Sequence, residues 1–66
     1  MDVTYSVREQ QEVGYGPVIG NYVAAGGAPP DEGTLIKIKG RLLRVVGVRS
    51  EKFDNTILVE PYADPG

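Results

Sequence analysis

The apolar pattern of residues 33–62 is the feature that most constrains the fold of this 66-residue chain. Residues 36–39 alternate apolar and basic side chains, which is the period of a strand with one buried face. Residues 42–48 form a run rich in valine and leucine, and β-branched side chains fit a pleated surface. Residues 56–59 repeat this character after a polar stretch in which Phe53 is expected to cover the core. The sequence therefore predicts a β-hairpin followed by a third strand.

The turn at Gly40 decides which hairpin residues face each other. Of three possible loops, one made of Lys39 and Gly40 would set Ile38 opposite Arg41. A loop made of Gly40 and Arg41 instead pairs Ile38 with Leu43 and keeps the apolar side chains on one face. Register follows the buried pattern, and a type II′ turn has glycine in its first position. The sequence therefore favours the loop made of Gly40 and Arg41.

Residues 13–33 differ from the rest of the chain, because they hold six of its nine glycines and three of its five prolines. Such a composition resists long regular elements. The segment also carries valine, isoleucine and tyrosine, in which disordered segments are poor. We expect an extended arm or long loop that packs on its own barrel or on a neighbour, with a short strand at 22–24. A turn is expected within residues 29–33, where Pro30 suits the second position of a turn and Gly33 suits the fourth position of one.

Together these patterns predict an all-β domain, either a small barrel or a curled antiparallel sheet of four to five short strands with an extended Gly/Pro-rich N-terminal arm. Residues 1–33 would form an N-terminal strand (at 2–8) and the arm, residues 34–62 the barrel core, and residues 63–66 a tail. A chain of this length buries only about 60% of the surface that its unfolded form exposes. A partner surface is therefore an expected further source of stability.

The chain contains neither cysteine nor histidine, which limits its chemistry. It cannot form a disulfide or a Ser–His–Asp triad, and it lacks the commonest metal ligand. We expect no enzyme activity, no metal, no cofactor and no small-molecule substrate. No apolar run approaches the roughly 20 residues of a membrane-spanning helix, and the N-terminus lacks the pattern of a signal peptide. The expected location is the cytoplasm of the producing cell, without a membrane contact.

Charge is unevenly distributed along the chain. Residues 1–33 carry a net charge of −4 and residues 34–66 a net charge of +2. In the favoured hairpin register Lys37 lies opposite Arg44, and like charges at such a position destabilise a sheet. A neutralising group is therefore expected there, either the phosphate backbone of a nucleic acid or a carboxylate such as Glu60 or one from the acidic front.

Two sets of side chains are candidates for binding. Tyrosine suits interfaces because one end is apolar and the other can hydrogen-bond, so the arm supplies the candidates for binding a protein partner. These are Tyr15, Val18, Ile19, Tyr22 and Val23. The basic residues of the hairpin region are the candidates for binding a nucleic acid: Lys37, Lys39, Arg41, Arg44 and Arg49.

The run GTLIKIKGRLLRVVGVRS, followed after a polar loop by NTILVEPY, resembles a known arrangement of strand, Gly-Arg turn, strand, polar loop and strand. This arrangement is similar to that of small barrels of the Src-homology-3-like kind. It also resembles the core of small tailed-bacteriophage virion proteins of the decoration or head-completion type. The resemblance covers residues 33–62 only, and it implies no catalytic residues.

These observations lead to one main functional expectation and two alternatives. The main expectation is a non-enzymatic structural or interaction protein that docks on a larger assembly, such as a phage capsid decoration, cement or neck protein. Its partner would be a homo-oligomer or a major structural protein, and it would move from the host cytoplasm into the virion. The first alternative is a small nucleic-acid-binding β-barrel. The second is a phage-encoded inhibitor of a host defence nuclease, whose acidic front would imitate phosphates.

Overall fold

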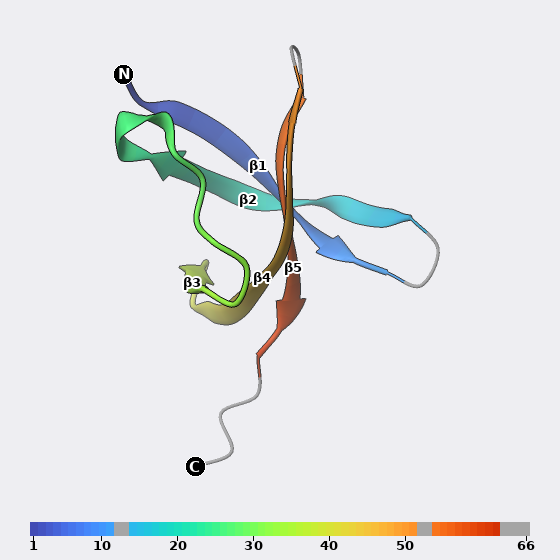
Figure 1. The fold of residues 1–66 in the computed structure, drawn as a ribbon. Coiled ribbons are helices and arrows are strands. Elements are labelled where there is room, and N and C mark those ends of the chain that lie inside the picture. The colour runs from blue at the N-terminus through green and yellow to red at the C-terminus, as the bar shows by residue number, and fades with distance from the viewer. Residues whose placement is uncertain (12–13, 52–53, 63–66) are drawn as a thin grey trace.

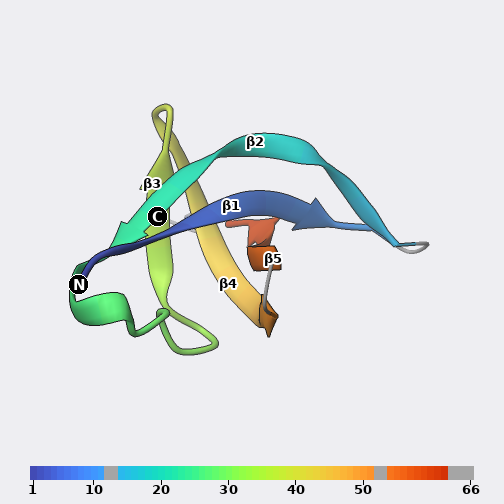
Figure 2. The same ribbon diagram turned by 90° about the horizontal axis from the view of Figure 1, so that it is seen from above.

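The computed structural model describes residues 1–11, 14–51 and 54–62, and these fold into five β-strands and one 3₁₀ turn (Figure 1). The elements, in chain order, are β1 (Val3–Gln10), β2 (Tyr15–Ala24), η1 (Ala25–Gly27), β3 (Leu35–Ile38), β4 (Arg41–Glu51) and β5 (Asp54–Pro61). All five strands belong to one sheet in the order β2-β1-β5-β4-β3. The sheet curls into a half-barrel, so that β2 arches across β3 and β4 in Figure 2. The predicted all-β curled sheet is confirmed.

The sheet is antiparallel except at its centre, where β1 and β5 run parallel. β1 and β2 form one hairpin, and β3, β4 and β5 form a three-stranded meander. The parallel ladder joins the two units, with Val7 beside Ile57. Parallel neighbours require a crossover connection, and here β2, β3 and β4 all lie between the two strands in the chain. The expectation of a wholly antiparallel sheet is therefore corrected at this pair.

The core lies on the concave side of the sheet. Val7, Leu43, Val45, Ile57 and Val59 are almost fully buried there. The register accounts for this, because Val7 lies beside Ile57, and Val45 lies opposite Val59. Tyr5, Ala24 and Ile36 complete this cluster. Leu58 is also buried, but it lies on the other face of the sheet, between Ile57 and Val59 along β5. β4 and β5 both lie in the interior of the sheet. The apolar side chains on both faces of 42–48 suit this position for β4.

A β-bulge in β4 explains why three valines in four positions fit one strand. The register shifts between Val45 and Gly47, so Val46 has no partner in β5. Val45 lies opposite Val59, and Val48 lies opposite Ile57. The bulge thus returns Val48 to the core side, where it packs against the buried cluster.

Residues 15–24 form strand β2, which pairs with β1 along its whole length. The expected arm is therefore extended, but it is a regular ten-residue strand of the chain's own sheet and not a long loop. Two register shifts near Arg8 accommodate its glycine and proline, since bulges tolerate both. Residues of 13–28 thus find an ordering partner in β1, and the contribution of another chain to their order stays a prediction.

The curl of the sheet brings β2 against β3 at one point. A Cβ atom placed on Gly20 would lie only 2.4 Å from the Cγ2 atom of Ile38, a separation that real side chains do not reach. Gly20 pairs with Val7 in β1 and so faces the core. Glycine is therefore required here by the close approach of Ile38, which closes the open side of the half-barrel.

The β3–β4 hairpin has a different register from the one that the sequence favoured. Ile38 lies opposite Arg41 and Ile36 opposite Leu43, so the loop consists of Lys39 and Gly40. Both loop residues have positive φ, 50° and 80°, as a type I′ turn requires.

The physical reason for this register lies outside the hairpin. Ile38 meets Gly20 across the half-barrel and needs no apolar partner in β4, while Arg41 opposite it reaches the Glu9 carboxylate of β1. Ile36 and Leu43 then form the buried pair. Contacts between strands that are distant in sequence therefore outweigh the local apolar match.

The turn before β3 also lies later than expected. The Thr34 amide donates to the Asp31 carbonyl at 3.1 Å, so Gly33 occupies the third position with a φ of 88°. Pro30 precedes this turn, and the predicted placement of Pro30 and Gly33 is corrected. The β5 strand includes the predicted 56–59 and ends at Pro61, which cannot donate to a further ladder. Phe53 lies outside the described residues.

We predict that Gly20→Ala lowers the free energy of unfolding by about 1–3 kcal/mol, because the added methyl overlaps Ile38. Gly47→Ala is the matched control, since its Cβ would meet Leu58 at an ordinary 3.6 Å. Urea denaturation measures both. The second substitution Ile38→Ala should recover part of the Gly20→Ala loss. Equal midpoints for the two alanine variants would contradict the close approach.

We also predict that Lys39→Asn raises the free energy of unfolding by about 0.5–1 kcal/mol, because asparagine tolerates the left-handed backbone of a type I′ turn. Gly40→Ala should lower it by about 1–2 kcal/mol. Thermal or urea unfolding provides the measurement. In the alternative register Lys39 would be a strand residue, and Lys39→Asn would destabilise the protein.

Candidate interaction surface

The convex side of the sheet, here called the outer face, carries the exposed large apolar side chains other than Met1. These are Tyr15, Val18, Val23, Leu35 and Leu42. The register places them there: Val18 pairs with Arg8, and Val23 pairs with Thr4, both of which alternate with the buried Tyr5 and Val7. Apolar side chains are thus divided between a closed concave core and an open outer face.

These five residues form two groups at opposite edges of the sheet. Tyr15, Val18 and Val23 lie on β2 and are called the β2 patch. Leu35 on β3 and Leu42 on β4 are called the leucine patch. In the ladder between these strands, Leu35 lies opposite Arg44, and Leu42 lies opposite Lys37. The two leucines are diagonal neighbours in this ladder, close enough for long side chains to meet.

The predicted partner-binding residues of the arm differ in how far the fold exposes them. Tyr15, Val18 and Val23 are exposed, whereas Ile19 and Tyr22 are half-buried and pack against the core. Ile19 and Tyr22 therefore contribute to the core of the domain. Only the exposed parts of their side chains are open to a partner. A partner at this segment stays a prediction.

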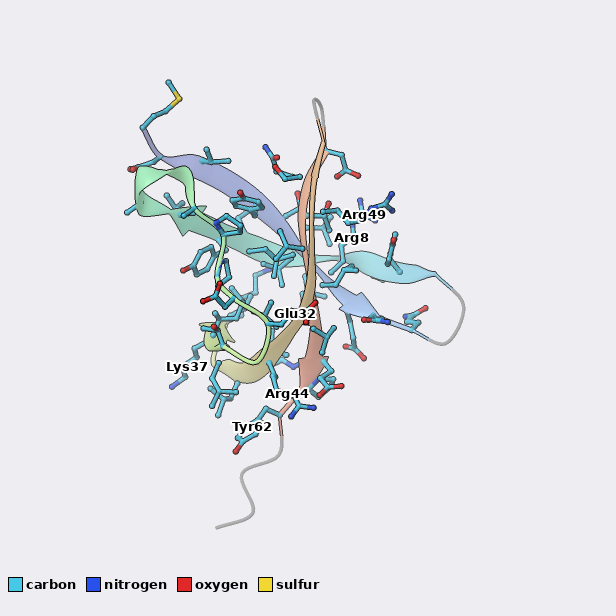
Figure 3. All side chains as sticks on the ribbon, in the orientation of Figure 1. Arg8, Glu32, Lys37, Arg44, Arg49 and Tyr62 are labelled. Carbon is cyan, nitrogen blue, oxygen red and sulfur yellow. The ribbon has the colours of Figure 1, made fainter. Side chains whose placement is uncertain are left out.

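Tyr15 on β2 contacts Arg49 on β4, a strand that is not its neighbour in the sheet. The Arg49 Nη1 atom donates to the Tyr15 hydroxyl at 2.6 Å, and the guanidinium lies 5.5 Å from the ring centre. Arg8 donates to the Gly16 carbonyl at 3.4 Å nearby, and Figure 3 shows Arg8 and Arg49 close to the crossing of the strands. The Tyr15 ring is thereby oriented on the outer face.

The basic residues proposed for nucleic-acid binding do not form one free basic surface. The Arg44 guanidinium donates to the Glu60 carboxylate on the neighbouring β5, which is the intramolecular neutralisation considered from the sequence. Arg41 lies 3.7 Å from Glu9. Lys37 pairs with Leu42 and not with Arg44, so the expected opposition of two like charges is wrong. Lys37 and Lys39 are exposed and have no ion-pair partner among the described residues.

Sequence reasoning missed the leucine patch and Arg8. Because apolar residues of a strand are as readily core residues, the sequence pattern gives no reason to treat Leu35 and Leu42 as a site. Their exposure follows from the outer position of β3 and the absence of a covering layer over the described sheet. The described residues enclose no pocket and bring together no cluster of metal-ligating side chains.

We predict that Arg44 and Glu60 couple by only about 0.2–1 kcal/mol, because their side chains are 48% and 39% exposed. A double-mutant cycle of Arg44→Met and Glu60→Gln, followed by urea denaturation, measures this coupling. The coupling should weaken at 1 M salt, at which the Debye length is about 3 Å. A coupling that is large and insensitive to salt would contradict this exposed geometry.

Within the described residues no helix has the length and apolar character needed to span a bilayer. Comparisons of the chain with protein-family models, curated proteins and solved structures give no match.

Proposed function

We propose that this protein is a non-enzymatic interaction protein that docks on a larger assembly through the outer face of its sheet. The observation that carries the proposal is the position of the exposed apolar side chains: among the described residues, and apart from Met1, the large ones lie on that face. Exposed apolar side chains scattered singly need no explanation, but their concentration on one face is typical of an interaction site.

The composition of the outer face supports this proposal. Aromatic residues and arginine are enriched at protein interfaces, and Tyr15 with Arg49 supplies both in a fixed arrangement. The leucine patch is bordered by Lys37 and by the Arg44–Glu60 ion pair, which provide a polar rim. A partner that covers either patch would remove apolar area from water, at about 25 cal/mol for each Å².

The resemblance of residues 33–62 to small tailed-phage virion proteins supports a narrower form of the proposal. In that form the assembly is a phage capsid or neck, and the protein is a decoration, cement or head-completion component. It would be synthesised in the host cytoplasm and then incorporated into the virion.

The two alternatives have less support. Nucleic-acid binding is favoured by the exposed Lys37 and Lys39 at the hairpin tip, but Arg41 and Arg44 already have carboxylate partners. Inhibition of a host nuclease would need a free acidic front. Glu9 in that front is engaged with Arg41.

The test is capture of the native assembly from producing cells with tagged protein and identification of stoichiometric partners by mass spectrometry. Two variants each lose one patch while keeping β-forming residues: Leu35→Thr with Leu42→Thr, and Val18→Thr with Val23→Thr. At least one should retain about tenfold less partner, because two buried apolar contacts are lost.

Asn21→Thr is the matched control, because Asn21 is an exposed polar residue of the same strand β2. It should retain the partner as the wild type does. If the wild type retains no stoichiometric partner, or if both folded double variants retain it fully, the proposed function is overturned.

A further inference from the structure

The two edges of the sheet differ in how they are protected from pairing with another strand. β3 is an edge of only four residues and carries Lys37, with Lys39 following in the turn. Short edge strands and lysine are devices by which proteins prevent edge-to-edge association. The β3 edge is thus protected by its length and by its charge.

The β2 edge has much less protection. β2 has ten residues and no charged side chain, and within the described part of the chain its sheet neighbour is β1 alone. Pro17 and the register shifts near Arg8 disturb one end of the strand. The remaining residues, 18–24, contain no proline and no charge. The register shift at Ile19 leaves residues 20–24 as a regular run of five residues, with Ile38 of β3 packed on Gly20 at one end. The outer edge of this run has no strand partner among the described residues.

Apolar side chains border this edge on both faces of the sheet. Val18 and Val23 are 47% and 59% exposed on the outer face. On the concave side Ile19 and Tyr22 are only half-buried at the margin of the core. A strand added beside β2 would cover side chains on both faces at once, and it would extend the small core.

We infer that a second copy of this chain pairs with β2 antiparallel along residues 20–24, so that two sheets join across a two-fold axis. An isologous interface places the same uncharged strand on both sides, so no charge is buried and like charges do not meet. A charged partner strand would find no ionic partner on β2. In a two-fold pairing of residues 20–24, Tyr22 instead meets the partner's Tyr22, and Val23 meets the uncharged side chain of the partner's Asn21. Main-chain hydrogen bonds supply affinity in such strand additions.

This inference rests on the proposed function, because it names one partner of the interaction protein as the protein itself. It assigns the β2 patch to self-association and leaves the leucine patch for the larger assembly. The two surfaces lie at opposite edges of the sheet, so a substitution in one should leave the other intact.

The test is the molar mass of the purified chain by sedimentation equilibrium, as a function of concentration. The wild type should form a dimer. Val23→Lys and Asn21→Lys each place one positive charge on the outer face of β2, and in the dimer these charges face the partner. Each should weaken dimerisation at least about tenfold. Asn21→Lys removes no apolar contact, and therefore separates the effect of charge from that of lost area.

Leu42→Lys is the matched control, because it places the same charge on the outer face but on β4. It should remain a dimer. Amide hydrogen exchange of the wild type should show protection of 20–24 that decreases on dilution, while the protection of β5 does not change. Circular dichroism checks that each variant is folded.

A wild type that stays monomeric at millimolar concentration overturns the inference. So does a dimer that Leu42→Lys disrupts and the folded β2 variants do not. Neither result affects the proposed docking on an assembly, which is judged by retention of a different protein. A wild-type dimer that retains no different protein from producing cells would instead overturn the proposed function alone.

Discussion

The parallel ladder between β1 and β5 is the interaction on which the rest of the structure depends. The N-terminal hairpin and the C-terminal meander are each antiparallel, and this ladder joins them into one sheet. Val7 and Ile57 meet in it, and both are fully buried. An isolated two-stranded hairpin is marginally stable at best in water, so β1 and β2 need this contact to persist. The ladder closes a loop of about fifty residues, which makes it a late and costly contact to form.

The curl that accompanies this ladder divides the apolar side chains into two populations. On the concave side they close a small core, in which Ile38 fits against Gly20. On the convex side the described structure provides no second layer, and the β2 and leucine patches stay exposed. A further layer packed on the convex side would cover this face, whereas a half-barrel encloses only its concave side. The functional proposal follows from this asymmetry.

Local patterns predicted the strands better than they predicted the neighbours of each strand. The alternation at 2–8 and the apolar runs at 42–48 and 56–59 correspond to β1, β4 and β5. The hairpin register was predicted wrongly, because only Gly20 and Glu9 explain why Ile38 faces Arg41. The sequence also indicated five residues of the arm as candidates for binding a partner. It could not separate the exposed Tyr15, Val18 and Val23 from Ile19 and Tyr22, because only long-range contacts show that the latter two pack on the core.

The sequence alone determined that the chain is all-β, and the apolar character of both faces of 42–48 placed this strand inside a sheet. These properties depend on side-chain period and composition, which are local. Only the tertiary structure decided that 15–24 is an edge strand, that β1 and β5 are parallel, and which apolar residues face outward. Such properties depend on contacts between segments distant in the chain, and the same local pattern is compatible with several such arrangements.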